Sequence, residues 1–311
     1  MKVLVIGGTG HIGKFLVPEL VESGCEVSVM FSGRTPAPET PPWEHVRKFT
    51  LNYADEPMLP SEMGLDPEVV IDLPGHLMRA VEAFEGSGVE HFIACGSVWM
   101  YGYPNVVPTP ERFFNRCRAE SYARRYEEIQ SLFERWSGSG PAFTAIMPPN
   151  IAGPAKIPLE GWGGRSLEVH RAHQQGEEVP LPDGPEALIG PCDAEDIAHC
   201  FALAVHHREA ARGHMFNVGA AYALTATRFI ETYSKIYGAR IPMRRVGWED
   251  YSTRISPDWG AHAHFEMHMC PDISKARALL GYEPRYTPEA ALERGVRWMH
   301  DNKMIQLMGN R

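Results

Sequence analysis

Short apolar runs alternate with amphipathic stretches through the first half of the chain. Six runs predict buried strands, at residues 2–6, 26–31, 45–52, 68–74, 90–97 and 143–150. Residues 13–24 and the stretch around "ESYARRYEEIQ" (120–130) have the periodicity of helices. Apolar strands alternating with helices are typical of a parallel sheet covered on both faces. The first half is therefore predicted to be a doubly wound α/β domain.

After Asn150 this pattern loosens. Residues 153–166 and 177–191 are rich in glycine and proline, which predicts loops rather than a linker between independent domains. With 311 residues, of which 44% are hydrophobic, the chain can bury a large core at about the size where one core becomes two. We expect one globular unit with two lobes.

Composition excludes several classes of partner. A formal charge of −9 argues against a nucleic-acid-binding surface, so we expect a small-molecule substrate. No run of 18 apolar residues occurs, and the N-terminal residues lack a basic region followed by a cleavage site, so we expect a cytoplasmic protein without a membrane partner. Six widely spaced cysteines indicate neither a disulfide framework nor a zinc knuckle. A homodimer is left open.

The most informative motif is "VIGGTGHIG". Gly7, Gly10 and Gly13 follow the first strand and open the first helix, where backbone N–H groups and the positive end of the helix can hold a dinucleotide pyrophosphate. The alternative is a tight strand-to-helix connection without a ligand. Because strand, turn and helix are in register, we favour the dinucleotide site.

These glycines, together with "CGSVWMYG" and "PPNIAGP", resemble the extended short-chain dehydrogenases, the group that contains UDP-galactose 4-epimerase and the nucleotide-sugar dehydratases. The resemblance extends over essentially the whole chain. It implies a Rossmann fold with a smaller C-terminal substrate lobe. By position it implies that Ser97 polarises a substrate oxygen and that Tyr122 is the catalytic acid/base group.

The family's Tyr-x-x-x-Lys motif is incomplete here, because Tyr126 stands where the lysine belongs. We expect Tyr126 one turn along the same helix face as Tyr122, near the place of the lysine ammonium. A free tyrosine has a pKa of about 10, so Tyr122 should titrate high without a cation beside it. Arg125 is the better of two candidate cations. The simpler interpretation, which we favour, is that Arg124 and Arg125 are exposed and paired with glutamates.

The expected cofactor is NADP, with NAD left open. The second strand ends in Phe31 and Ser32, without the acidic residue that holds the ribose hydroxyls in NAD enzymes, and Ser32 and Arg34 could hold a 2′-phosphate. An alternative role for Arg34 is to cap a solvent loop. By resemblance and position, the expected cofactor-binding residues are Gly7, Thr9, Gly10, His11, Ile12, Gly13, Ser32, Arg34, Asn52, Leu73, Pro74, Pro149, Asn150 and Ile151.

The resemblance also predicts how the lobes divide the chain. An apolar helix in "DIAHCFALAV" and a strand in "HMFNV" resemble the end of the family's first lobe, so residues 193–218 should return to it. We therefore expect a dinucleotide-binding domain of residues 1–154 plus 191–218. Residues 155–190 plus 219–311 should form the substrate-binding lobe.

Three histidines, His262, His264 and His268, lie close together in "AHAHFEMH". Imidazoles at close spacing suit zinc or iron, but this spacing matches no metalloenzyme motif, and we expect no metal site. We favour a loop that lines the substrate pocket.

Three functions are compatible with these residues. We favour an NAD(P)-dependent oxidoreductase or epimerase/dehydratase that acts on a small hydroxylated or carbonyl substrate, such as a sugar nucleotide or natural-product intermediate. The alternatives are a non-redox lyase or isomerase with a structural or absent dinucleotide, and a non-catalytic dinucleotide sensor. Ser97 and Tyr122 argue against the sensor, while the missing lysine weakens the redox interpretation.

Overall fold

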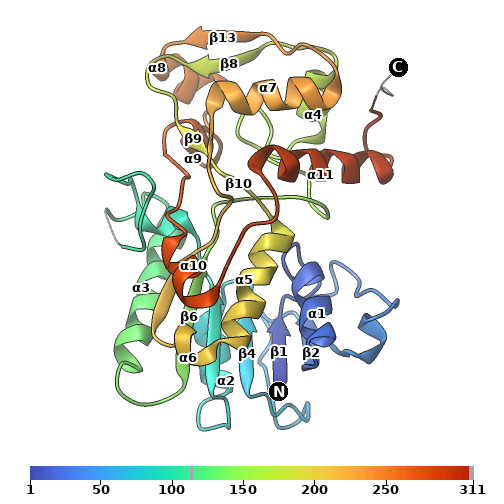
Figure 1. Cartoon of the computed structure of the whole chain (residues 1–311), viewed down its shortest axis with the longest axis vertical. Coiled ribbons are helices and arrows are strands. Elements are labelled where there is room, and N and C mark those ends of the chain that lie inside the picture. The colour runs from blue at the N-terminus through green and yellow to red at the C-terminus, as the bar shows by residue number, and fades with distance from the viewer. Residues whose placement is uncertain (113–114, 308–311) are drawn as a thin grey trace.

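The computed structural model describes residues 1–112 and 115–307. A parallel sheet of seven strands lies at the centre of the larger lobe, in the order β11-β6-β5-β4-β1-β2-β3 (Figure 1). Its strands are β1 (Lys2–Ile6), β2 (Glu26–Phe31), β3 (Arg47–Thr50), β4 (Val69–Asp72), β5 (His91–Cys95), β6 (Ala142–Met147) and β11 (His214–Asn217). The strand order reverses between β1 and β4, and dinucleotides bind at such a reversal in doubly wound folds.

Helices cover both faces of this sheet, which explains why its strands are apolar throughout. Val3 and Val5 of β1 lie in the core cluster that contains residues of α1 and α5, while Leu4 and Ile6 lie in the cluster that contains residues of α2 and α3. These helices are α1 (Gly13–Glu22), α2 (Leu77–Ala83), α3 (Glu120–Arg135) and α5 (Ala194–His206). The predicted doubly wound α/β fold is confirmed.

The smaller lobe lies beyond the carboxyl ends of the strands, at the top of Figure 1, and has its own core. Buried aromatic residues on α7, among them Phe229 and Tyr233, pack with Leu292 and Val296 of α11. The helices of this lobe are α4 (Leu167–Gln174), α7 (Ala226–Tyr237), α8 (Trp248–Asp250), α9 (Trp259–His262) and α11 (Pro288–Asp301). The short strands outside the main sheet are β7 (Asn150–Ala152), β8 (Val179–Pro182), β9 (Leu188–Ile189), β10 (Pro191–Asp193), β12 (Leu224–Thr225) and β13 (Met243–Val246).

The chain crosses between the lobes more than once. After β10, helix α5 packs against α1, and β11 pairs with β6 in parallel, so residues 193–218 lie with the sheet. Helix α10 (Ser274–Leu280) also packs against α5, α6 (Arg208–Ala211) and β11. Part of the range 219–311, which the sequence assigns to the substrate lobe, therefore lies against the sheet, because α10 and the following Tyr282 bury apolar side chains there.

An ion pair joins the two lobes below the site. The Arg294 guanidinium on α11 donates to the fully buried Asp193 carboxylate at 2.9 Å and to Glu195 at 2.6 Å. Burial raises the pKa of Asp193 to about 6, and the attraction of Arg294 opposes that shift. One guanidinium therefore bonds two carboxylates at the start of α5 and ties α11 to that helix.

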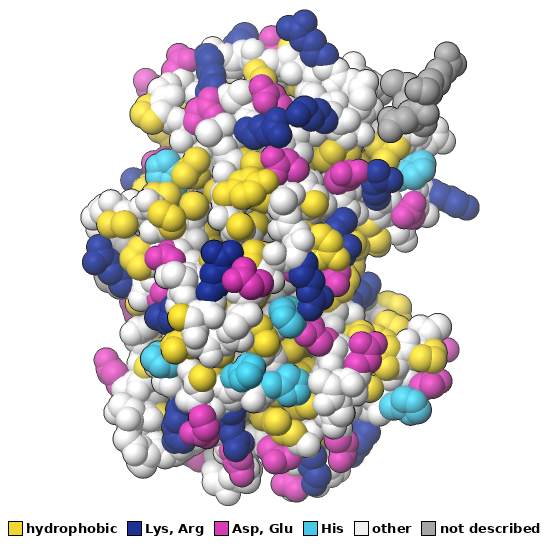
Figure 2. All heavy atoms as spheres, in the orientation of Figure 1, with side chains coloured by type: hydrophobic (Ala, Val, Ile, Leu, Met, Phe, Trp, Pro, Cys, Tyr) yellow, Lys and Arg dark blue, Asp and Glu magenta, His cyan; other side chains and the backbone are white. Residues whose placement is uncertain are grey.

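On the face shown in Figure 2, basic and acidic side chains are interspersed, without a continuous patch of one sign. Within residues 1–112 and 115–307, no helix is both long and apolar enough to cross a membrane.

Candidate functional site

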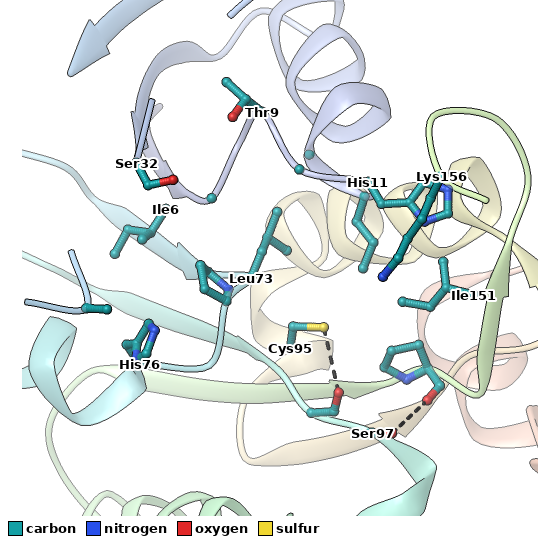
Figure 3. Close-up of a pocket in the computed structure, with 18 of the residues that line it drawn as sticks. Ile6, Thr9, His11, Ser32, Leu73, His76, Cys95, Ser97, Ile151 and Lys156 are labelled. Atoms are coloured by element: carbon teal, nitrogen blue, oxygen red, sulfur yellow. Dashed lines mark hydrogen bonds between the residues drawn. The ribbon is translucent and has the colours of Figure 1, made fainter. Parts of the chain in front are cut away.

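A cavity of about 690 Å³ opens at the carboxyl ends of the strands, where the strand order reverses (Figure 3). Its walls come from the β1–α1 turn, the ends of β2, β4, β5 and β6, helix α3, and two segments of the smaller lobe. Every residue expected from the sequence to bind the dinucleotide lines this cavity, together with Ser97 and Tyr122. The fold thus brings together residues from many separate segments because parallel strands end at one edge.

The glycine-rich turn needs glycine for steric reasons. Gly7 has φ +78°, and a Cβ there would lie 2.8 Å from Pro74. A Cβ on Gly13 would lie 2.3 Å from the Gly8 carbonyl oxygen, so α1 can begin directly against the turn only without a side chain. The first N–H groups of a helix have no partners within the helix, and the start of α1 faces the cavity. This arrangement suits a pyrophosphate.

At the far end of the cavity, Ser32 and Arg34 are exposed on its rim, and Asn52 lines it. No Asp or Glu is among the described residues that line the cavity. Asp55 and Glu56 bond Asn52 but do not line the cavity. The Asn52 backbone N–H donates to Glu56 at 3.0 Å, and the Asn52 side-chain amide donates to Asp55. The rim of the cavity near the end of β2 therefore offers no carboxylate for ribose hydroxyls.

The proposed catalytic pair, Ser97 and Tyr122, lines the same cavity. Ser97 begins the 3-10 turn η2 (Val98–Tyr101); its hydroxyl accepts the Trp99 N–H at 3.3 Å and donates to the Pro148 carbonyl at 3.4 Å. The second bond is long and hence weak, so the hydroxyl can turn toward a substrate. Tyr122, on the first turn of α3, is half-buried. Burial raises the pKa of its hydroxyl above the ordinary value.

Arg125, rather than Tyr126, occupies the cavity beside Tyr122. Its guanidinium donates to the Cys95 carbonyl oxygen at 2.7 Å and opposes the rise in the Tyr122 pKa. Gly75 makes this possible, since a Cβ there would lie 2.1 Å from the guanidinium. The simpler sequence interpretation, an exposed Arg125 paired with a glutamate, is wrong, because in the described structure Arg125 is half-buried and forms no ion pair.

The structure corrects the expected place of Tyr126. Tyr126 lines a second cavity, of about 640 Å³, on the other side of α3, and its ring meets that of Tyr101 edge-on at 6.2 Å. An α-helix turns by about 100° per residue, so the residues three and four positions after Tyr122 lie on opposite sides of Tyr122 around the helix axis. Packing of α3 against the sheet turns the Arg125 side toward the first cavity.

Several cavity residues were not identified from the sequence. Lys156 and Arg165 come from loops of the smaller lobe, and Trp99 and Trp259 line the same cavity. His264 also lines it, in the segment that the sequence suggested as a pocket loop. Neither cation lies in a motif with a chemical interpretation. A weak clue to the two cations was their place in the glycine-rich segment 153–166, directly after the "PPNIAGP" motif.

The three histidines of "AHAHFEMH" separate in space. His264 Nδ1 lies 2.7 Å from the Asn150 amide nitrogen, while His262 bonds the Ser256 carbonyl and His268 accepts the Leu188 N–H. Burial lowers the pKa of His264 to about 3, so its ring is neutral. Within the described part of the chain, no group of three or more His, Cys, Asp or Glu side chains is placed to hold a metal.

The residues present fit a nicotinamide dinucleotide. The glycine turn and the start of α1 form a cradle for the pyrophosphate, as described above. The Asn150 side-chain oxygen is buried in the cavity wall without a hydrogen-bond partner among the described residues. A carboxamide N–H could satisfy this acceptor, whose burial otherwise carries a cost.

A model of the NAD dependent epimerase/dehydratase family matches residues 75–219. The chain is 24% identical over 304 residues to the chloroplast stem-loop binding protein of 41 kDa b of Arabidopsis thaliana, covering 92% of this chain and 75% of that protein. It is also 24% identical over 327 residues to a UDP-glucose 4-epimerase of Corynebacterium glutamicum, covering 92% of each.

Solved structures share the fold. The UDP-glucose 4-epimerase of Thermotoga maritima, solved with UDP-glucose, has a TM-score of 0.74 at 21% identity, covering 97% of this chain and 100% of that one. The Bordetella bronchiseptica enzyme WbmG, solved with NAD, has a TM-score of 0.73 at 16% identity, covering 100% and 97%. The family match and the epimerase relatives indicate an NAD-dependent enzyme. By this match and by its fold, the chain resembles the NAD dependent epimerase/dehydratase family.

Proposed function

We propose that the protein is an NAD(P)-dependent oxidoreductase or epimerase/dehydratase that acts on a hydroxyl or carbonyl group of a small molecule. The observation that carries this proposal is the meeting of Ser97, Tyr122 and Arg125 with the dinucleotide cradle in one cavity. The bound dinucleotide would supply or accept the hydride. The chain's own residues hold the substrate oxygen and move its proton.

Tyr122 is the proton donor and acceptor in this proposal. Its raised pKa keeps the hydroxyl protonated at neutral pH, which suits donation of a proton to a carbonyl oxygen as it is reduced. The reverse reaction needs the phenolate, so oxidation of a hydroxyl should become faster toward alkaline pH. Ser97 leaves its long bond to Pro148 and donates to the same substrate oxygen.

Arg125 takes the electrostatic part of the absent lysine. Its positive charge stabilises the phenolate of Tyr122 and limits the rise of the pKa that burial causes. An arginine remains protonated at all relevant pH values, so it acts as a fixed charge and cannot relay a proton. Its bond to Cys95 and the space left by Gly75 hold that charge in place.

For the cofactor we propose NADP in preference to NAD. Arg34 and Ser32 lie on the rim of the cavity, where the end of β2 provides no carboxylate. A guanidinium suits the 2′-phosphate, whereas a carboxylate would repel it.

Two tyrosine variants on one helix test the proposal. Tyr122→Phe and the matched control Tyr126→Phe are compared for dinucleotide affinity by calorimetry and for hydride transfer by nicotinamide absorbance. UDP-glucose, bound by the Thermotoga maritima relative, is the first substrate and a panel of small alcohols and carbonyl compounds follows. We expect Tyr122→Phe to reduce the rate on the order of a hundredfold without changing dinucleotide affinity, and Tyr126→Phe to change neither.

Full activity of the Tyr122 variant would refute the role of that hydroxyl. Absence of dinucleotide binding to the unmodified protein would refute the redox proposal as a whole. In that case a lyase or isomerase on the same scaffold becomes the better explanation.

A further inference from the structure

Two cations of the cavity, Lys156 and Arg165, are not used by the chemistry proposed above. Both line the end of the cavity that the smaller lobe contributes, together with Trp99 and Trp259. Figure 3 shows the Lys156 side chain extending into the cavity next to His11 and Ile151. No carboxylate is among the described residues that line this cavity, and the hydrogen bonds of Arg165 go to backbone carbonyl oxygens.

Arg165 braces the segment that carries Lys156. Its guanidinium donates to the Ile151 carbonyl at 2.8 Å and to the Ile157 carbonyl at 2.7 Å, so both ends of segment 151–157 are bound to one side chain. These two bonds leave further N–H donors of the guanidinium unused. Ala155, directly before Lys156, has φ +77°, a left-handed conformation that side-chain-bearing residues rarely adopt. Such strain persists where the surrounding structure requires it, and it is concentrated at functional sites.

The two cations are close enough to repel each other. Burial lowers the pKa of Lys156, and the charge of Arg165 lowers it further. The charge of the buried Glu160 acts on Arg165, but its carboxylate accepts the Trp162 N–H at 2.5 Å and does not line the cavity. Arg165 is half-buried and Lys156 is exposed toward the cavity, and no carboxylate among the described lining residues offsets their charges. An anion between the two cations would relieve their repulsion.

We propose that Lys156 and Arg165 form a subsite for an anionic group of the substrate, a carboxylate or a phosphate carried near the carbon on which Tyr122 acts. This inference rests on the proposed function, because it locates the reacting carbon at Tyr122. Arg165 and Tyr122 line the same cavity, so one small molecule can carry both the anion and the reacting oxygen. The indole rings of Trp99 and Trp259 provide an apolar surface for its carbon skeleton.

Matched pairs of ligands test the subsite. The protein saturated with dinucleotide is titrated by calorimetry with glucose, glucuronic acid, glucose 6-phosphate, inorganic phosphate and UDP-glucose. We expect the two anionic sugars to bind at least tenfold more tightly than glucose. UDP-glucose distinguishes the sources of charge, because its diphosphate is attached at the anomeric carbon instead of C6 and continues into a uridine. It should therefore gain less from this subsite than glucose 6-phosphate does.

Lys156→Gln should reduce the affinity ratio between the anionic sugars and glucose roughly tenfold. The control Lys235→Gln, at an exposed position on α7, should leave that ratio unchanged. Arg165→Lys keeps the charge but cannot bind both carbonyl oxygens, so it should weaken anion binding while circular dichroism shows an intact fold. Glucose affinity should be unchanged in all three variants. Since Lys156 forms no hydrogen bond with described residues, its variant remains informative even if the Arg165 variant unfolds.

Equal affinity for glucose and the anionic sugars, or no binding of any anion, would overturn the inference. So would a Lys156→Gln variant that loses dinucleotide affinity and keeps its preference for anions, because Lys156 would then belong to the cofactor cradle. Failure of the proposed function gives a different result, namely no dinucleotide binding. The same titrations on dinucleotide-free protein would still compare glucose with the anionic sugars.

Discussion

Replacing Asp72 by asparagine should stabilise the protein at neutral pH and much less in acid. Asp72 ends β4, is almost fully buried, and neither of its oxygens has a hydrogen-bond partner of normal geometry among the described residues. Burial raises its pKa from 3.8 to about 6, against the opposing effects of the backbone N–H groups of His76 and Gly75 and of the Arg125 charge. The isosteric amide avoids burying a negative charge.

The sign follows from proton binding. The carboxyl group holds its proton more tightly in the folded state. The contribution of Asp72 to the free energy of unfolding is therefore fully present below about pH 4 and is lost as the pH rises to about 6. A difference of about two pKa units corresponds to about 3 kcal/mol in the free energy of unfolding, as an upper estimate. The advantage of Asp72→Asn over the unmodified protein should therefore grow by about 2 kcal/mol between about pH 4.5 and about pH 7.5.

Urea unfolding followed by tryptophan fluorescence measures this difference at each pH. Comparing the two proteins cancels the titration of distant groups. Asp183→Asn, at an exposed carboxylate, is the control and should shift unfolding by the same small amount at every pH. An Asp72→Asn advantage that stays constant or shrinks with rising pH would refute the explanation that a buried charge is lost.

Three further predictions concern the cavity. Gly75→Ala should displace the Arg125 guanidinium and shift the pH profile of hydride transfer toward alkaline pH, whereas Gly24→Ala, with φ +86° but open space around its Cβ, controls for backbone strain and should not. Tyr126→Lys should leave that pH profile unchanged, since its side chain lines the other cavity; an acid shift would show that a lysine there reaches the site. Arg34→Ala should lower NADP affinity about tenfold and spare NAD affinity in calorimetric titrations, and equal losses would remove Arg34 from 2′-phosphate binding.

Local sequence determined the sheet and the dinucleotide cradle. The apolar runs at residues 2–6 and 26–31 are the strands β1 and β2, because two buried faces require apolar residues at every position. Gly7, Gly10 and Gly13 follow β1 in the turn before α1, so the local sequence places them at the end of that strand. The other expected cofactor residues follow strand ends, and parallel strands place those ends at one edge.

Tertiary packing decided which side chains complete the site. Helical periodicity places Arg125 and Tyr126 about equally near Tyr122, and only the packing of α3, with the space above Gly75, selects Arg125. Lys156 and Arg165 could not be found from the sequence, because they lie in irregular segments whose paths depend on long-range contacts rather than on a period.

The return of α10 to the sheet has the same origin. Its amphipathic pattern predicts a helix but does not specify which apolar surface it covers, and that surface is built from α5, α6 and β11, which lie far away in the sequence. The charge of the cavity was also decided by tertiary structure. The chain carries a net charge of −9, whereas the described residues that line the cavity include arginine and lysine and no carboxylate. Net charge is a property of composition, whereas the local field that a ligand meets depends on which charged side chains the fold brings to one place.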